Sequence, residues 1–248
     1  MLLIGLTGGI ATGKSSVSSI ISSMNLPIID ADLLARQVVE PNKPAYNSIL
    51  STFGPSVLLP SGHIDRKKLA SIVFNDPVAR KKLNTATHPD IRREMLLLVL
   101  HHFLRLQRAC VLDTPLLFEA GLHKFVHEKV VVYCPEQTQL ARLIARDNLT
   151  PTEAQSRISS QMPIDQKRSL ASILIDNSNS KEDTQKQVEQ MVARTLPSKF
   201  RTVIVWSLLC VPAALLYGLV KGWETCSGLW ARIRARDSIR GGGRVHMD

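Results

Sequence analysis

The sequence predicts a three-layer α/β fold, in which a parallel β-sheet lies between two layers of helices. Three features of the 248-residue chain indicate it. Short continuous apolar runs alternate with segments of helical periodicity, a glycine-rich loop follows the first apolar run, and helix start signals precede several of the helical segments. With 44% hydrophobic and 21% charged residues, the composition is globular and excludes fibrous or wholly disordered chains.

Residues 2–32 predict the first two strands and the first helix. The apolar run 2–7 stops at glycines, as a buried strand does, and apolar side chains then recur at helical spacing over residues 14–24. A second apolar run, residues 26–29, predicts the second strand and ends at Asp30-Ala31-Asp32.

The long segment 33–108 is predicted to be helical. Turn or boundary signals stand at Pro44, Gly54, residues 60–62 and His88-Pro89. After the last of these, one helical face collects the apolar side chains of Ile91, Met95, Leu98, Val99, Phe103 and Leu106.

Three further strands complete a five-stranded sheet. Residues 110–113 and 129–133 are continuously apolar, as parallel strands buried on both faces require, and residues 172–175 supply the fifth strand. A helix starts near Pro135. Another starts at residues 150–153, which have the form of a capping box with proline at the first helical position, and runs to about residue 161. A closing helix is predicted over residues 180–196, with an apolar stripe formed by Val188, Met191, Val192 and Leu196.

The segment after Pro197 differs in character. Residues 202–220 contain no charged side chain, basic residues flank them, and aromatic residues lie towards their ends. This length and pattern favour a membrane-spanning helix, and a buried core helix is the alternative. The net charge of +10 divides evenly here, because residues 1–196 carry 23 Lys and Arg against 18 Asp and Glu, and residues 197–248 carry 8 against 3.

The glycine-rich loop carries the most specific motif. It fits G-x-x-x-x-G-K-[ST] and lies between a predicted strand and a predicted helix, so it predicts a nucleoside-triphosphate site. The residues of this phosphate-binding loop are Gly8, Gly9, Ile10, Ala11, Thr12, Gly13, Lys14 and Ser15. Lys14 is expected to bridge the β- and γ-phosphates and Ser15 to ligate Mg²⁺. A chance glycine-rich turn is the alternative.

The chain lacks the marks of other nucleotide-binding classes. It has no N-K-x-D base-reading motif of a GTPase, since its one Asn-Lys pair, Asn42-Lys43, is followed by Pro44-Ala45, and no signature sequence of an ABC-type ATPase is seen. Its mild positive bias suits phosphorylated small molecules and gives no dense basic stripe, so no nucleic-acid partner is expected.

Asp30 and Asp32 follow the second strand, at the edge where open α/β sheets bind ligands. A carboxylate there is placed to accept a hydroxyl proton during phosphoryl transfer. An N-cap for the following helix is the alternative role for Asp32. Asp113, at the end of the third strand, is either a water-mediated Mg²⁺ ligand or an ordinary strand-end aspartate.

Together these motifs resemble a known family, the dephospho-coenzyme A kinases. The resemblance covers residues 1–196 and rests on segments 5–10, 30–36, 115–119 (Pro-Leu-Leu-Phe-Glu) and 175–177 (Ile-Asp-Asn), in the family's order. It implies a P-loop kinase with a helical substrate-binding insertion over 33–108 and a lid over 148–170, followed by a C-terminal apolar helix. It also implies transfer of the ATP γ-phosphate to the 3′-hydroxyl of dephospho-CoA.

The resemblance assigns roles residue by residue. The catalytic set is Asp32 as general base, Lys14 and the phosphate-contacting Arg142; Asn177 joins the nucleotide site. The substrate-binding positions are Asp32, Arg36, His88, Leu116, Glu119 and Arg146. The basic pair Lys167-Arg168 and Arg157 belong to the lid.

Three of these residues also have an interpretation without a functional role. A solvated surface arginine is the alternative for Arg36 and for Arg146, although Arg142 and Arg146, four residues apart, share a helix face suited to neutralising phosphoryl charge. For His88, the alternative to a substrate-binding role is a structural histidine at a helix start.

The hydrophobic tail resembles the eukaryotic dephospho-CoA kinase domain-containing proteins. It predicts a tail anchor on the mitochondrial outer membrane with the first 196 residues facing the cytosol, and the chain is not expected to be secreted. Other enzymes of the same pathway are possible partners. The competing functions are a kinase for another small nucleotide-like acceptor and a membrane-tethered nucleotide-binding scaffold.

Overall fold

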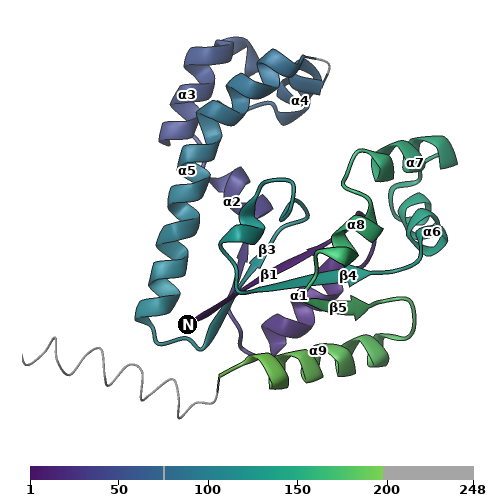
Figure 1. Ribbon diagram of the computed structural model, residues 1–248. Helices are drawn as coiled ribbons and strands as arrows, with labels where there is room; N and C mark the ends of the chain where they lie inside the picture. Colours follow the sequence, from purple (N-terminus) through teal and green to yellow (C-terminus); the bar gives the residue numbers. More distant parts are fainter. Residues whose placement is uncertain (75, 198–248) are drawn as a thin grey trace, which may run out of the picture. The chain divides into compact units, whose positions relative to one another are not determined.

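The computed structural model describes residues 1–74 and 76–197, which contain a five-stranded parallel sheet (Figure 1). The strands are β1 (Leu2–Gly8), β2 (Ile28–Asp30), β3 (Ala109–Asp113), β4 (Glu128–Tyr133) and β5 (Ile173–Asp176). Their order is β2-β3-β1-β4-β5, so the first strand is central. All four pairings are parallel, and each strand therefore ends at the same edge of the sheet.

Helices connect the strands and cover both faces of the sheet, as short parallel strands require. The helices are α1 (Lys14–Ser23), α2 (Ala31–Gln37), α3 (Pro44–Phe53), α4 (Arg66–Phe74), α5 (Pro77–Leu104), α6 (Glu136–Asp147), α7 (Pro151–Ser159), α8 (Ile164–Ser169) and α9 (Lys181–Thr195). Two short 3₁₀ helices, η1 (Pro55–Val57) and η2 (Leu122–Lys124), lie in connections.

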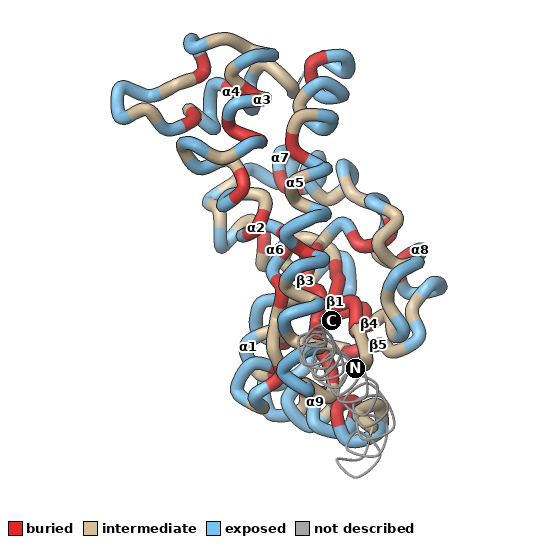
Figure 2. The backbone as a smooth tube through the Cα atoms, turned by 90° about the vertical axis from the view of Figure 1, so that its left-hand side faces the viewer, coloured by how far each residue is buried: buried red, intermediate tan, exposed pale blue. Residues whose placement is uncertain are grey.

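Three hydrophobic clusters hold this domain together. Helices α1 and α9 pack on one face of the sheet through residues such as Val17 and Val188, and α2 and α5 pack on the other through Leu34 and Met95. The third cluster joins α3, α4 and the upper part of α5, around Ile49. Figure 2 shows the buried residues concentrated along the strands. The helical segment thus has a small core of its own beyond the sheet.

The predicted helix boundary at His88-Pro89 is wrong. Helix α5 is 28 residues long and continues without a break through Pro89, although proline lacks the N–H that an interior helical position donates. Packing explains the continuity, because Leu83 and Ala86 before this point pack with α3 and α4, and Met95 after it packs with α2 and the sheet. Leu106 also fails to join the predicted apolar face. It lies past the helix end with φ of 60° and is 53% exposed.

The predicted membrane-spanning segment, residues 202–220, lies outside the described residues, and so does the predicted C-terminal apolar helix. Within residues 1–74 and 76–197, no helix combines the length and the apolar character that crossing a bilayer requires.

Candidate active site

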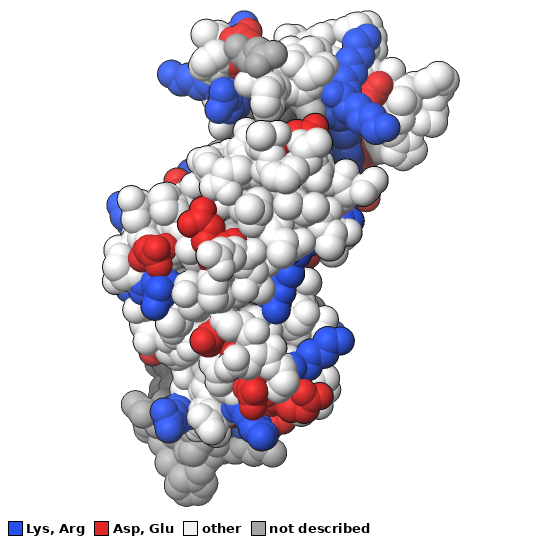
Figure 3. All heavy atoms as spheres, turned by 90° about the vertical axis from the view of Figure 1, so that its right-hand side faces the viewer, with Lys and Arg blue, Asp and Glu red and all other residues white. Residues whose placement is uncertain are grey.

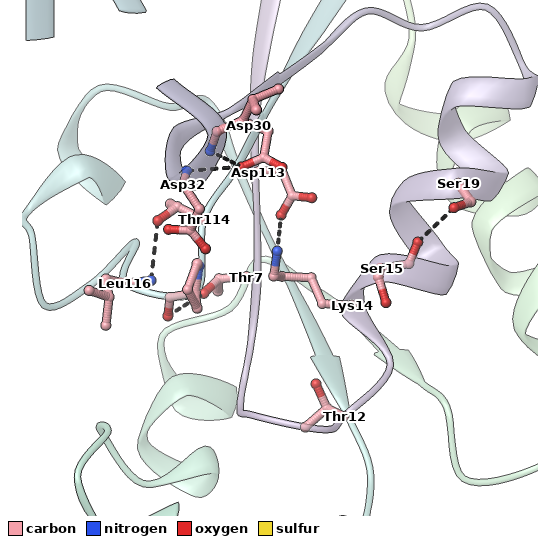
Figure 4. Close-up of polar contacts among 12 residues, drawn as sticks. Thr7, Thr12, Lys14, Ser15, Ser19, Asp30, Asp32, Asp113, Thr114 and Leu116 are labelled. Atoms are coloured by element: carbon pink, nitrogen blue, oxygen red, sulfur yellow. Dashed lines mark hydrogen bonds and ion pairs between the residues drawn. The ribbon is translucent and has the colours of Figure 1, made fainter. Parts of the chain in front are cut away.

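The phosphate-binding loop connects the central strand β1 to α1 (Figure 4). Its backbone turns sharply, with φ of 59° at Ala11 and 90° at Gly13. Gly8 is required because a Cβ there would lie 2.7 Å from Thr12 Oγ1 and 2.8 Å from the Val132 carbonyl oxygen. The loop therefore brings backbone N–H groups and the N-terminus of the ten-residue α1 to one place, which is the geometry of a phosphate site.

Asn177 supports the loop from behind. Its amide Nδ2 donates to the Thr12 carbonyl oxygen at 2.8 Å, and its Oδ1 accepts from Thr184 Oγ1 at 2.8 Å. A Cβ on Gly13 would lie 1.9 Å from Asn177 Nδ2. The structure thus brings Asn177 to the predicted nucleotide site, where it holds the loop's main chain.

Lys14 forms an ion pair with Asp113 in this structure. Because β3 neighbours β1 in the sheet, Asp113 ends its strand beside the loop, and its side chain is only 6% exposed. Figure 4 shows the Lys14 ammonium group pointing towards this carboxylate. Such a pairing at the loop favours the nucleotide-site role of Asp113 over that of an ordinary strand-end aspartate.

Asp30, and not Asp32, caps helix α2. Asp30 Oδ1 accepts from the backbone N–H groups of Asp32 at 2.9 Å and Leu33 at 3.0 Å, so the alternative capping role for Asp32 is wrong. The Asp32 carboxylate is left available for chemistry. Burial raises the pKa of Asp32; Lys14 opposes the rise, while Asp30 and Asp113 add to it. A carboxyl group whose pKa is raised is a better proton acceptor than an ordinary aspartate.

A cavity of about 520 Å³ opens between α2 and the helical segment α3–α5. Asp32, Arg36 and His88 all line it, so the structure brings these three predicted substrate residues together. Its far wall is apolar and includes Ile64. Sequence reasoning missed Arg66, which also lines the cavity and donates to the Arg36 carbonyl oxygen at 3.2 Å. Placed inside α5, His88 is not a helix-start residue.

The loop after β3 contacts the segment predicted as the lid. Glu119 pairs with Lys167 at 2.9 Å and accepts from the Met162 N–H at 3.2 Å. Burial alone would raise the pKa of Glu119, yet the hydrogen bonds, foremost from Lys167, hold it below its usual value. Lys167 is fully buried and also donates to the Pro115 carbonyl oxygen at 2.7 Å. Glu119 is thus engaged within the protein, whereas Leu116 is 44% exposed.

The two arginines of α6 have different partners. Arg142 lies by Cys134. Burial raises the pKa of the Cys134 thiol, and the Arg142 guanidinium offsets part of this rise. Arg146 instead pairs with Asp147 at 2.8 Å and is exposed, and Arg157 of α7 pairs with the same carboxylate at 3.0 Å. In this structure, therefore, Arg146 is paired with the neighbouring Asp147, whereas Arg142 lies beside Cys134.

Magnesium fits the oxygen donors at the loop. Within residues 1–74 and 76–197, no cluster of three or more His, Cys, Asp or Glu side chains is arranged to hold a metal ion. Mg²⁺ needs no such cage, since it keeps several waters and takes one or two protein oxygens together with phosphate oxygens. The Ser15 hydroxyl and the Asp113 carboxylate supply oxygens of that kind beside the loop.

The loop, the ion pair and the free carboxylate beside a cavity define a P-loop kinase. Comparison with known proteins gives the family. Residues 2–183 match the dephospho-CoA kinase family. A dephospho-CoA kinase domain-containing protein from Danio rerio is 52% identical over 189 residues, covering 76% of this chain and 82% of that protein. The chain belongs to the dephospho-CoA kinase family.

Bacterial relatives and solved structures agree. A dephospho-CoA kinase from Shouchella clausii is 48% identical over 192 residues, covering 77% of this chain and 98% of that protein. A crystal structure from Thermus thermophilus is 31% identical with a TM-score of 0.67, and the two matched segments cover 79% and 98% of the respective chains. A dephospho-CoA kinase from Campylobacter jejuni is 30% identical with a TM-score of 0.56, covering 78% and 97%.

Proposed function

We propose that this chain transfers the γ-phosphate of ATP to the 3′-hydroxyl of dephospho-CoA, giving coenzyme A and ADP, the final step of coenzyme A synthesis. The observation that carries the proposal is the Asp32 carboxylate. It is freed from capping by Asp30, lies near the Lys14–Asp113 pair, and lines the 520 Å³ cavity. One group therefore faces both the nucleotide site and an acceptor cavity.

The chemistry of the step balances with the residues present. Asp32 accepts the proton of the 3′-hydroxyl as its oxygen bonds to the γ-phosphorus, and the bond from that phosphorus to the β–γ bridging oxygen breaks to release ADP. Lys14 exchanges Asp113 for phosphate oxygens and, with Arg142, offsets their charge. Mg²⁺, when bound through Ser15, neutralises further phosphate charge.

Arg36 and Arg66 line the cavity, and further basic residues on the same helical segment suit a polyanionic acceptor. Figure 3 shows basic side chains gathered at the upper end of the molecule, where the helical segment lies. Six exposed basic residues belong to α4 and the first turns of α5, namely Arg66, Lys67, Lys68, Arg80, Lys81 and Lys82. Dephospho-CoA carries a pyrophosphate, so this field attracts it more strongly than an uncharged nucleoside.

An acceptor comparison tests the proposal. The full chain is assayed for ATP consumption with dephospho-CoA, with nucleosides and with nucleoside monophosphates, each at equal concentration. ATP consumption that depends strictly on dephospho-CoA is expected. Faster turnover of another acceptor would assign a different small-molecule kinase, and ATP binding without turnover of any acceptor would support the scaffold alternative.

We further propose that residues 202–220 anchor the protein in a membrane, with the mitochondrial outer membrane favoured and the kinase domain facing the cytosol. The nineteen uncharged residues, their basic flanks and the aromatic side chains Trp206 and Tyr217 support it. Cell fractionation with alkaline extraction tests the anchor, and protease digestion of intact mitochondria tests the orientation. Release of the protein by alkaline extraction would overturn the anchor, and protection of the kinase domain from protease would overturn the orientation.

A further inference from the structure

Two glutamine side chains bind the backbone of Ile10 in the phosphate-binding loop, one at its N–H group and the other at its carbonyl oxygen. Gln161 Oε1 accepts from the Ile10 N–H at 3.0 Å, and Gln139 Nε2 donates to the Ile10 carbonyl oxygen at 2.7 Å. Gln139 belongs to α6, and Gln161 lies between α7 and α8. Residues about 130 and 150 positions away in the sequence therefore meet at a single loop residue.

The contact of Gln139 with the loop is tight. Its side chain is 2% exposed, and a Cβ on Gly9 would lie 2.8 Å from Gln139 Nε2. Gln139 and Gln161 line the same cavity of about 240 Å³, which separates the loop from α7 and α8. Gln139 of α6 and Gln161 of the predicted lid thus both contact the phosphate-binding loop directly.

The loop needs such support because of its backbone. Ala11 has φ of 59°, and Gly13 has φ of 90°. A non-glycine residue in that region is strained, so it persists only where the surroundings fix it. Ile10 directly precedes Ala11, and fixing both of its polar groups fixes the chain that enters the strained turn.

Gln161 is itself held through its neighbours. The Met162 N–H donates to Glu119 Oε1 at 3.2 Å, and Glu119 pairs with the buried Lys167 at 2.9 Å. Lys167 also reaches the Pro115 carbonyl oxygen at 2.7 Å, to which Thr7 Oγ1 donates at 3.1 Å. The segment 161–167 therefore joins the phosphate-binding loop to the loop after β3.

We propose that Gln161 is a positioning residue, which orders the phosphate-binding loop for ATP only while the segment 161–167 is seated on Glu119. Seating the segment pre-organises the loop, and this lowers the cost of ordering it when phosphate binds. Lifting the segment releases Ile10 and loosens the loop, so the state of the predicted lid is coupled to nucleotide affinity. This inference rests on the proposed kinase function for its substrate, ATP, and not for the identity of the acceptor.

The test replaces Gln161 by methionine (Gln161→Met) in the full chain, which keeps the side-chain volume and removes the acceptor oxygen. Since one hydrogen bond is worth roughly a factor of five, the Kd and KM for ATP are expected to rise about five-fold. The KM for dephospho-CoA should stay within about two-fold, because Gln161 does not line the acceptor cavity. Amide hydrogen exchange of the loop peptide should become faster in the absence of nucleotide.

Gln166→Met is the matched control. Gln166 is exposed on α8, and its side chain has no hydrogen-bond partner among the described residues. This substitution should leave ATP binding and loop exchange unchanged. A second variant, Lys167→Met, removes the contacts of the segment 161–167 with Glu119 and Pro115 at its C-terminal end. Its effect on the Kd for ATP should be less than additive with that of Gln161→Met, because both remove the same contact.

Unchanged Kd for ATP and unchanged loop exchange in Gln161→Met would overturn the proposal, and so would equal rises in the KM of both substrates. ATP binding is measured without an acceptor, so the two proposals fail separately. If the unchanged chain turns over no dephospho-CoA, the proposed reaction is refuted. If Gln161→Met nevertheless binds ATP more weakly than the unchanged chain, the proposed role of Gln161 is kept.

Discussion

At the scale of single residues, Asp32 is the group on which the proposed chemistry depends. Asp32→Asn keeps the shape of the side chain and removes the proton acceptor. We expect unchanged ATP affinity and a kcat lower by about 10²–10⁴-fold, the range that general base catalysis supplies. Calorimetric ATP binding and steady-state rates on the same preparation check this. A variant with near-normal kcat would remove Asp32 from the mechanism.

The raised pKa of Asp32 gives a pH signature. Burial is the main cause, Lys14 opposes it, and the carboxylates of Asp30 and Asp113 add to it. A base works only when it is deprotonated, so kcat should fall as the pH drops through this pKa, at a higher pH than for an ordinary aspartate. Asp113→Asn removes one neighbouring negative charge and should move this acid limb to lower pH. An unmoved kcat–pH profile would contradict the assignment.

At the scale of elements, helix α2 carries Asp32 and Arg36 into the cavity, and the Asp30 cap sets where the helix begins. Asp30→Ala should lower the free energy of unfolding by about 1 kcal/mol and also lower kcat, because α2 loses its N-terminal hydrogen bonds. Asp76→Ala is the control. Asp76 caps α5 in the same way, with bonds of 2.8 and 3.1 Å to Val78 and Ala79, and does not line the cavity.

Both variants should lose similar stability in urea unfolding, and only Asp30→Ala should lose kcat. If Asp76→Ala lowers kcat as much, the loss reflects general destabilisation of the helical segment and not the placement of Asp32.

How much the sequence predicts depends on the range of the interaction at each element. The capping box at Thr150 and Glu153 is local, and both of its hydrogen bonds form as predicted. The path of α5 through Pro89 is decided by packing against α3 and α4, which local signals do not contain. Likewise, Asp30 and Asp32 have the same chemistry, and only the turn into α2 decides which one caps.

The site follows the same division. The phosphate-binding loop is contiguous in sequence, so its pattern predicts its location beside α1. Gln139 and Gln161 reach the loop across long sequence separations, and no local pattern marks a glutamine that binds a distant backbone group. Helical spacing puts Arg146 on the same helix face as Arg142, yet Asp147 next to it binds its guanidinium.

At the scale of the whole molecule, the C-terminal helix of the described domain, α9, is part of its core. The cluster on the α1 face of the sheet draws Val188, Met191 and Val192 from α9, and Leu196 packs against it. Arg108, which precedes β3, donates to the Pro197 carbonyl oxygen at 2.8 Å. We therefore expect residues 1–197 to fold without the later residues.

A chain truncated after Pro197 is thus expected to unfold with the same midpoint as the domain within the full chain and to keep acceptor-dependent ATP consumption. Truncation after Ser180 is the matched control, because it removes α9 with three buried apolar side chains, each worth about 1.5–3 kcal/mol. Their sum is comparable to the roughly 5–15 kcal/mol by which domains are stable, so the shorter chain should not fold. Circular dichroism during heating measures both. A midpoint well below that of the full chain for residues 1–197 would show that the tail contributes to the core.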